Sequence, residues 1–406
     1  MNSDHLFIYE NIPELVTLSG AVQKKGRHPT EEDLGIIRNA SLVVDTASST
    51  IEWVGTSAEL PKSFETVINR QSGEGVWFPE LVECHTHLIF AGLRHHDYAL
   101  RATGKSYLEI ASRGGGILST LTHTRKASME ELVQGAASEL DRFQKYGVGT
   151  VEIKSGYGLS LESELKILNC VKALQEFTSV NLIPTFMPAH ATPPEFKGKT
   201  DDYVNVICSE WLPTVAKEEL ATFFDVFIEE GFFTLAQAQK MCAKAKELGF
   251  GIKLHVDQFN NLGGTSLGLE IGATSLDHLE HVNENQIAAF AKAETVAVLL
   301  PGASLYTKIP YPPARKLLDA GARVALSTDY SPGTCPSRNL PLMTTLACSQ
   351  MGMTIAEAIV GVTYNAAAAL GLEDDFGSIQ VGKPFRVCQF KAPSFEVLPY
   401  CFGEME

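Results

Sequence analysis

The pattern of hydrophobic and polar positions changes near residue 76. Before this point the sequence contains short segments such as SLVVDTASSTIEWVG, which is rich in Val, Ile, Thr and Trp and is interrupted by turn-like polar residues. After it, short and nearly continuous apolar runs alternate with longer segments of helical character. The first part therefore predicts short β-strands, and the second predicts strands that alternate with helices.

Eight apolar runs in the second part have the length and composition of buried strands. They cover residues 76–87, 148–158, 180–190, 224–231, 251–258, 274–282, 295–304 and 322–333. The segments between them contain helix signals, such as the capping box of Ser128 with Glu131 and the N-cap residue Thr234. Apolar strands that alternate with helices are typical of a parallel sheet, and eight such units predict a (β/α)8 TIM-like barrel.

The two ends of the chain are expected to meet outside this barrel. After a helix expected at residues 356–372, the sequence returns to the β-like segment GSIQVGKPFRVCQF. We therefore predict the fold class α/β, with the barrel at residues 76–372. A small β-sandwich-like domain is expected from residues 1–75 and 373–406 together.

Composition narrows the class of protein. Hydrophobic residues make up 45% of the chain and charged residues 20%, as in an ordinary globular protein. The net charge of −15 is spread without blocks, which argues against a nucleic-acid partner because phosphate binding needs a clustered basic face. We expect no signal peptide and no membrane-spanning segment. The eight cysteines include no CxxC pair, which favours reduced thiols in a cytoplasmic protein.

Polar residues interrupt the apolar runs at their far ends. These strand-end residues are His85, His87, Tyr157, His190, Glu229, His255, His278 and Asp329. A single strand-end histidine is more often a packing or loop residue, but here five of the eleven histidines end four separate strands. Because catalytic residues of such barrels lie at the C-terminal ends of the strands, we interpret this set as one site.

Four of these residues have the chemistry of a metal site. His85 and His87 share one face of a strand, since side chains alternate with a period of two. His255 on the fifth strand and Asp329 on the eighth can complete a set of three imidazoles and one carboxylate. Such donors suit zinc or iron, and we expect one ion per chain, with zinc preferred and iron as the alternative. Cys84 should face away from His85, so we do not include it among the metal ligands.

At these residues the sequence resembles the imidazolonepropionase family of the amidohydrolase superfamily. The matching stretches, in order, are HTHLIFAGLR, GKSYLEIASRGGGILSTLTHTRKAS, EIKSGYGL, PAHATPPE, KLHVDQ, DHLEHV, LLPGA and TDYSPG. The resemblance implies a metal-dependent hydrolase that converts 4-imidazolone-5-propanoate to N-formimidoyl-L-glutamate in histidine degradation. It also implies a homodimer.

The resemblance assigns roles to individual residues. The implied metal ligands are His85, His87, His255 and Asp329, and the implied catalytic pair is His278 and Asp329. Substrate contacts are implied for Arg94, Tyr107, Tyr157, His190, Gln258, Ser331, Gly333 and Thr334. An arginine fork and tyrosine hydroxyls suit a propionate carboxylate. Which of His278 and Asp329 acts as the general base stays open.

The sequence departs from the family pattern at several positions. Gln258 stands where some members carry a glutamate, and a glutamine cannot transfer a proton. Ser331 replaces a common asparagine, which removes an amide donor. Glu80 and Glu83 replace the usual Gly and Asp before the first histidines, and we expect them to alter local packing more than ligation. GKPFRV lacks the common Ala-Asp of the superfamily, which should affect only the small domain.

Other interpretations stay open. A related deaminase that releases ammonia would use the same ligands, and a non-catalytic binding or assembly barrel would usually have lost one of them. Glu229 and Glu230 could mark a second metal, but the lysine that bridges metals in binuclear relatives is missing there. Packing, surface or loop roles are expected for the remaining histidines of this region, His95, His96, His123 and His281.

Overall fold

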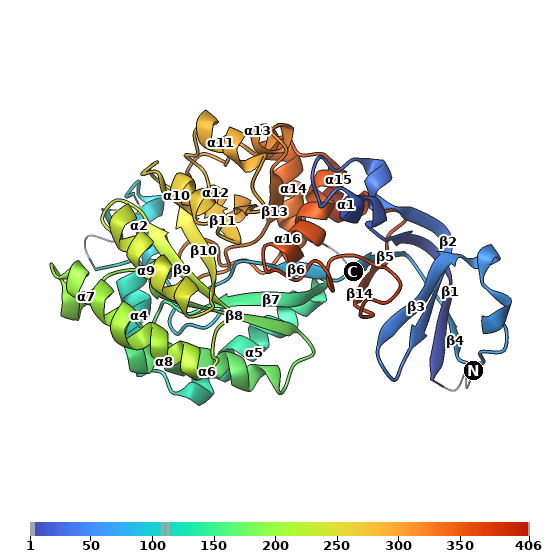
Figure 1. The fold of residues 1–406 in the computed structure, drawn as a ribbon, viewed down its shortest axis with the longest axis horizontal. Helices are drawn as coiled ribbons and strands as arrows, with labels where there is room; N and C mark the ends of the chain where they lie inside the picture. The colour runs from blue at the N-terminus through green and yellow to red at the C-terminus, as the bar shows by residue number, and fades with distance from the viewer. Residues whose placement is uncertain (1–4, 107–108, 111–113, 405–406) are drawn as a thin grey trace.

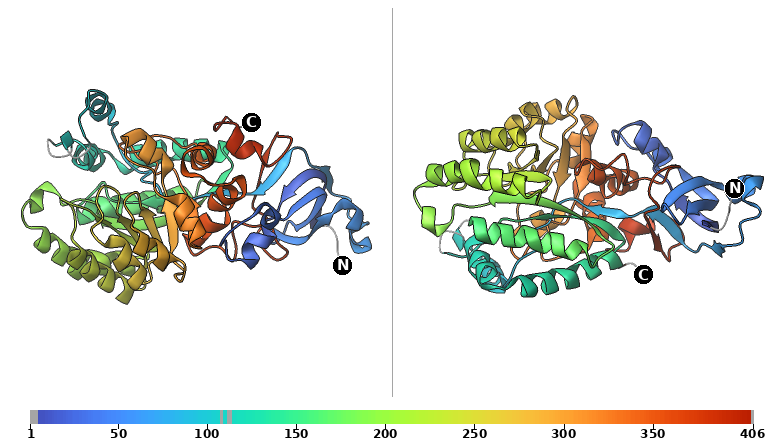
Figure 2. Two further views of the ribbon diagram at one scale, coloured as in Figure 1. Left: turned by 90° about the horizontal axis from the view of Figure 1, so that it is seen from above. Right: turned by 60° about the horizontal axis from the view of Figure 1, so that its bottom comes forward.

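The computed structural model describes residues 5–106, 109–110 and 114–404, which form two separate sheets, the larger one surrounded by helices (Figure 1). The smaller sheet has six strands in the order β14-β5-β1-β2-β3, with β4 paired to β1. Its strands are β1 (Leu6–Val16), β2 (Ile36–Asp45), β3 (Thr50–Thr56), β4 (Arg70–Ser72), β5 (Val76–Pro79) and β14 (Val387–Phe390). Both ends of the chain thus contribute to it, and it lies at one end of the molecule in all views (Figures 1 and 2).

The larger sheet is the expected parallel barrel. Its eight strands are β6 (Leu81–Glu83), β7 (Val148–Lys154), β8 (Asn181–Ala189), β9 (Phe223–Ile228), β10 (Gly251–Val256), β11 (Ser275–His278), β12 (Val296–Leu299) and β13 (Arg323–Leu326). They pair in sequence order, every pair parallel. A parallel bridge between Thr86 and Tyr330 joins the first strand to the last, where the His87 amide donates to the Tyr330 carbonyl at 2.8 Å. The prediction of a (β/α)8 barrel is confirmed.

The expected first barrel strand, residues 76–87, is divided between the two sheets. Its first part is β5, which pairs with β1 and β14, and the barrel begins only at β6. The chain changes partner between two neighbouring amides. The Glu80 amide donates to the Arg386 carbonyl next to β14 of the small sheet, and the Leu81 amide donates to the Gly147 carbonyl next to β7. Pro79 immediately precedes this point and lacks the N–H that a continuous ladder needs. The domain limits at residues 75 and 372 stay a prediction.

Helices cover the outside of the barrel (Figures 1 and 2). The helices are α1 (Ser19–Gln23), α2 (His95–Ala102), α4 (Ile117–Lys126), α5 (Met129–Lys145), α6 (Leu161–Gln175), α7 (Thr200–Val206), α8 (Leu212–Lys217), α9 (Leu235–Glu247), α10 (Gly264–Glu270), α11 (Glu284–Phe290), α12 (Pro301–Thr307), α13 (Ala314–Asp319), α14 (Leu340–Met351), α15 (Ile355–Gly361), α16 (Tyr364–Ala368) and α17 (Val397–Tyr400). The capping box of Ser128 and Glu131 begins α5, and Thr234 caps α9, as predicted. The single helix expected at residues 356–372 is instead two helices, α15 and α16, because Thr363 between them has non-helical backbone angles.

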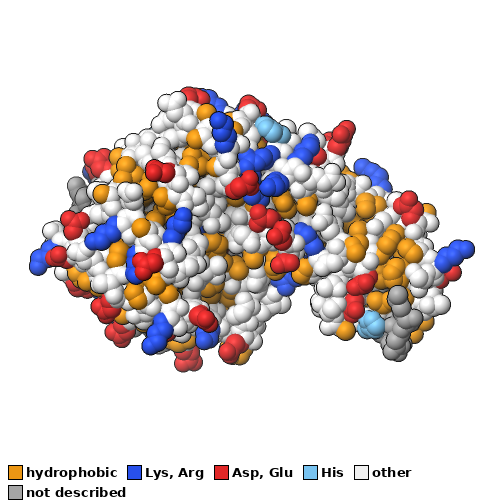
Figure 3. All heavy atoms as spheres, viewed as in Figure 1, with side chains coloured by type: hydrophobic (Ala, Val, Ile, Leu, Met, Phe, Trp, Pro, Cys, Tyr) orange, Lys and Arg blue, Asp and Glu red, His pale blue; other side chains and the backbone are white. Residues whose placement is uncertain are grey.

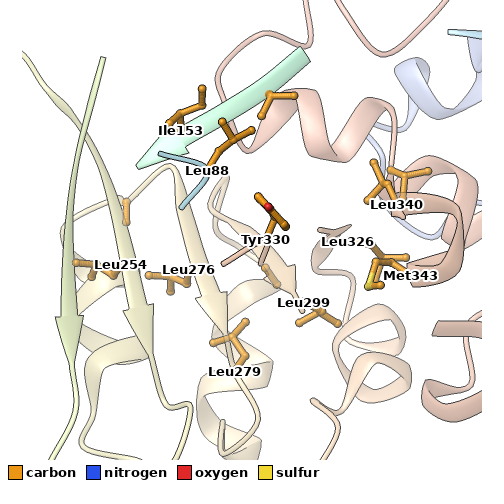
Figure 4. Close-up of a cluster of buried hydrophobic side chains, with 14 of the residues drawn as sticks. Leu88, Ile153, Leu254, Leu276, Leu279, Leu299, Leu326, Tyr330, Leu340 and Met343 are labelled. Carbon is orange, nitrogen blue, oxygen red and sulfur yellow. The ribbon is translucent and has the colours of Figure 1, made fainter. Parts of the chain in front are cut away.

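The core explains why polar side chains gather inside the barrel. Leu254, Leu276 and Leu299 lie on neighbouring strands within one apolar cluster (Figure 4). Because side chains alternate along a strand, the residues beside them in sequence point to the other face. On β10 and β11 those residues include His255 and Asp277, which are buried although they are polar.

The surface is mixed in charge. Lys and Arg side chains are interspersed with Asp and Glu on the face drawn in Figure 3. All eight cysteines are free thiols. Within the described residues, no helix is long and apolar enough to cross a membrane.

Candidate active site

Four residues predicted as metal ligands converge at one end of the barrel. His85 and His87 directly follow β6, His255 belongs to β10, and Asp329 follows β13. The Nε2 atoms of His87 and His255 are 3.3 Å apart, and Asp329 Oδ1 lies 3.5 Å from His85 Nε2. Two overlapping sets of donor atoms each lie within 4.8 Å: His85 with His87 and Asp329, and His85 with His255 and His278.

Two of the three candidate ligand histidines, His85 and His255, are oriented as metal ligands require. His85 Nδ1 donates to Asp277 Oδ2 at 2.6 Å, and His255 Nδ1 lies 3.1 Å from the carboxylate of Asp225. Each hydrogen bond fixes the proton on Nδ1 and leaves the lone pair on Nε2, the usual arrangement around a bound metal. His85 Nε2 is buried and has no hydrogen-bond partner among the described residues. The donor set therefore fits a divalent cation such as Zn²⁺.

Burial sets the protonation of the cluster. Desolvation lowers the pKa of His85 and of His87 well below the usual value, so both imidazoles are neutral at physiological pH. Burial also raises the pKa of Asp329 to about 6, against the opposing effect of nearby His278. Neutral imidazoles are the form that binds a metal.

His278 has a different environment. Burial acts to lower its pKa, but the nearby carboxylates of Glu280, Asp329 and Asp277, Glu280 foremost, raise the pKa above the usual value. His278 Nδ1 lies 3.6 Å from Glu280 Oε1, which accepts a hydrogen bond from Ser304 at 3.1 Å. His278 and Leu279 have φ angles of 86° and 69°, a left-handed conformation that costs energy for such residues and is concentrated at functional sites.

Most residues predicted to contact substrate line the same pocket. Its described lining comprises His87, Arg94, Ile117, Tyr157, His190, Phe227, His255, Gln258, His278, Asp329, Ser331 and Thr334. The accessible volume of this pocket is small, about 30 Å³. Tyr107 lies outside the described residues.

Arg94 has the geometry of an anion-binding group. It is only 6% exposed, and its Nε donates to Thr120 Oγ1 at 2.7 Å. Its guanidinium carbon lies 5.4 Å from the ring centre of Tyr157. Nη2 is buried and has no hydrogen-bond partner within the described part of the chain. Gly333 packs so closely that an added Cβ would lie 2.1 Å from Arg94 Nη1.

Three other predicted residues hold neighbouring parts of the pocket. Thr334 Oγ1 donates to Asp329 Oδ2 at 2.5 Å and lies 2.7 Å from Ser331 Oγ. His190 stacks on His87 with 4.6 Å between ring centres, and its Nδ1 donates to the Gly156 carbonyl. Thr334 thus contacts Asp329 directly, and Ser331 holds Thr334 from the other side.

Comparisons with known proteins agree with this arrangement. The sequence profile of the amidohydrolase family matches residues 194–397. A protein of Bdellovibrio bacteriovorus named imidazolonepropionase is 46% identical over 93% of this chain and 88% of its own length. One of Symbiobacterium thermophilum with the same name is 42% identical over 96% of this chain and 92% of its own. The chain belongs to the imidazolonepropionase family.

A solved structure outside this family has the same fold. An adenosine deaminase from Xanthomonas campestris with bound zinc superimposes with a TM-score of 0.71 and 15% identity, covering 98% of this chain and 90% of that one. Membership in the amidohydrolase family and the clustered donor atoms support a metal cofactor for this imidazolonepropionase-family chain.

Glu229, which follows β9, has a structural role in this member of the imidazolonepropionase family. Glu229 accepts hydrogen bonds from the amides of Phe259 and Asn260 and from the Asn260 side chain, at 2.9–3.2 Å. It belongs to neither donor set found among the described residues. Glu229 therefore anchors the loop after β10, and this use of its oxygens argues against a second metal there.

The two glutamates before the first histidines also have defined partners. Glu83 is fully buried and accepts from the amides of His85 and Thr328, and burial raises its pKa to about 8. Glu80 forms an ion pair with Arg386 at 2.6 Å, which links the barrel to the small sheet. His95, His96, His123 and His281 are exposed.

Sequence reasoning missed several residues around the site. Asp277 and Asp225 orient His85 and His255, and Lys154 lies beside the two aspartates. Glu280 lies 3.6 Å from His278 Nδ1. The sequence does contain a signal, namely charged residues within or next to apolar strands. Such residues are rarely fully buried unless they have a partner, so their positions indicate buried pairs. The sequence alone did not reveal the partners.

Proposed function

We propose that this chain hydrolyses the cyclic amide bond of 4-imidazolone-5-propanoate to N-formimidoyl-L-glutamate, with one metal ion held by His85, His87, His255 and Asp329. The observation that carries this proposal is the buried Arg94, whose Nη2 has no hydrogen-bond partner among the described residues, in the pocket that His87, His255 and Asp329 also line. The names of relatives 42–46% identical over nearly the whole chain support the substrate. Zinc is preferred over iron, since the donors suit both but zinc is the commoner catalytic ion for them.

When bound, the metal supplies a Lewis acid and lowers the pKa of water from about 15.7 to about 7. The surrounding protein orients the side chains that would bind the metal. Asp277 and Asp225 keep the Nε2 lone pairs of His85 and His255 directed into the site. Thr334 holds one oxygen of Asp329, so the other oxygen faces the histidine nitrogens.

The pocket provides separate groups for the two ends of the substrate. Arg94 donates paired charge-assisted hydrogen bonds to the propionate carboxylate, and Tyr157 lies beside it. At the other end, the carboxylate of Asp329 takes a proton from the attacking water. His278, with Glu280 behind it, polarises the ring carbonyl and donates a proton to the departing nitrogen. Gln258 contacts substrate without transferring a proton.

Product analysis tests this proposal. Purified, metal-replete protein is incubated with 4-imidazolone-5-propanoate, and the products are identified by mass spectrometry with a parallel ammonia assay. We expect a product heavier by one water, no ammonia, loss of turnover with a chelator and recovery with Zn²⁺. The matched controls are His85→Ala, expected to be inactive, and His123→Ala at an exposed histidine, expected to be active.

Other outcomes would replace the proposal. Release of ammonia would identify a deaminase with the same ligands. Unchanged substrate, with metal still bound, would mean that the site acts on another cyclic amide or only binds its ligand.

We further propose that the protein is a cytoplasmic homodimer. This rests on family resemblance and on the free cysteines. Light scattering on the purified protein tests the dimer, since a monomeric mass at micromolar concentration would contradict it.

A further inference from the structure

Five charged side chains form a buried cluster inside the barrel beneath the candidate metal site. The members of this buried charge cluster are Glu152, Lys154, Asp225, Lys253 and Asp277, each with 0% exposure. Burying ions costs several kcal/mol per ion unless each has a close partner of opposite charge. Each member of the buried charge cluster therefore depends on a close neighbour of opposite charge.

Lys154 is the member with the most ionic contacts. It lies at the end of β7, and its Nζ is 2.7 Å from Glu152 Oε1 and 2.8 Å from Asp225 Oδ2. The same atom is 3.6 Å from Asp277 Oδ2. Lys154 thus reaches from β7 to two other strands, β9 and β11.

Both aspartates in contact with Lys154 also contact a candidate ligand. Asp225 lies 3.1 Å from Nδ1 of His255, and Asp277 lies 2.6 Å from Nδ1 of His85. One ammonium group therefore lies behind two separate aspartate–histidine pairs.

We propose that Lys154 is a positioning residue, which holds Asp225 and Asp277 in place and thereby fixes the ring orientation and tautomer of His255 and His85. This inference rests on the metal site of the proposed function but not on the identity of the substrate. Without the ammonium group, the two buried carboxylates lose the contact that links their strands and are no longer held in place. Movement of either carboxylate weakens the acceptor for Nδ1–H, so Nε2 is no longer held as the metal-binding atom.

Lys253 offers a matched comparison within the same cluster. It is equally buried, but its Nζ is hydrogen-bonded to Ser275 Oγ at 2.7 Å and to the Ala369 carbonyl at 3.2 Å. It approaches Asp277 only at 3.8 Å, and no contact with Asp225 is recorded within the described residues. Replacing Lys253 removes a buried lysine of the barrel but leaves the Asp225–His255 pair intact.

Cobalt binding to the metal-free protein tests the proposal. Apo forms of wild type, Lys154→Met and Lys253→Met are titrated with Co²⁺ against a chromophoric chelator, and the visible d–d spectrum reports coordination geometry. We expect Lys154→Met to bind Co²⁺ about 10–100-fold more weakly, as for other partners of metal-bound histidines, and to show an altered spectrum. Lys253→Met should stay within about threefold of wild type, and Lys154→Arg should recover part of the loss.

A folded Lys154→Met protein with wild-type affinity and spectrum would overturn the proposal, as would equal losses in the two methionine variants. If Lys154→Met does not fold, the charge-balanced variant Glu152→Gln/Lys154→Gln replaces it with the same expectation. No substrate is present, so a wrong substrate assignment leaves these results unchanged. Failure of wild type to bind Co²⁺ would overturn the metal site and this inference together.

Discussion

Arg94 is where the substrate assignment can be tested most directly. In Arg94→Lys the planar fork is replaced by a single ammonium, so one of two hydrogen bonds to the substrate carboxylate is lost. A hydrogen bond to a charged group contributes about 1.5–3 kcal/mol, and each 1.4 kcal/mol is about tenfold in rate. Because Arg94 is buried, water screens little of this, and kcat/KM for 4-imidazolone-5-propanoate should fall about 10–100-fold.

The assay compares that substrate with an analogue whose carboxylate is replaced by a neutral amide. Arg94→Lys should affect the analogue less than about threefold, because no charged fork is lost with it. Gly333→Ala provides a second perturbation, since its Cβ would lie 2.1 Å from Arg94 Nη1 and must displace the guanidinium. Equal losses of kcat/KM for both compounds would refute the role of Arg94 in carboxylate recognition. Arg94 would then act in folding or at the ring end of the substrate.

Three further predictions concern the metal, the proton donor and the fold. Removing the metal should lower the melting temperature, since an ion at 100 times its Kd stabilises the folded state by about 2.7 kcal/mol; an unchanged calorimetric transition after chelation would contradict this. Glu280→Gln should lower kcat about tenfold or more with little change in KM. Because Glu280 raises the pKa of His278, the alkaline limb of the kcat profile should also move to lower pH, and a limb at unchanged pH would argue against the contact. Ser128→Ala should destabilise the protein by about 1 kcal/mol in urea unfolding by removing the cap of α5, whereas an unchanged midpoint would mean that packing alone holds that end.

The sequence predicts what depends on local periodicity. Apolar runs of strand length separated by amphipathic segments specify the barrel, and the spacing of His85 and His87 specifies a shared face. Capping residues such as Ser128 specify where a helix begins. These features depend only on residues near each other in the chain.

The sequence did not predict what depends on pairing between distant segments. The run at residues 76–87 shows no turn signal that divides it, yet β5 and β6 belong to different sheets because their partners come from different parts of the chain. Lys154 is separated from Asp225 by 71 positions, so their contact depends on strand order and register. Similarly, the position of Glu229 at the end of a strand does not indicate whether its carboxylate binds a metal or accepts hydrogen bonds from a loop.

The bridge between Thr86 and Tyr330 has a consequence for how the protein is made. His85 and His87 lie on one side of this junction and Asp329 on the other, so the candidate ligands come from both ends of the barrel sequence. At about 5–20 residues per second, the roughly 240 residues between the two sides take on the order of 10–50 s to synthesise on a ribosome. Until Tyr330 emerges, the nascent barrel is an open sheet with an incomplete ligand set. Metal loading therefore belongs to the final stage of assembly, after translation of the last barrel strand.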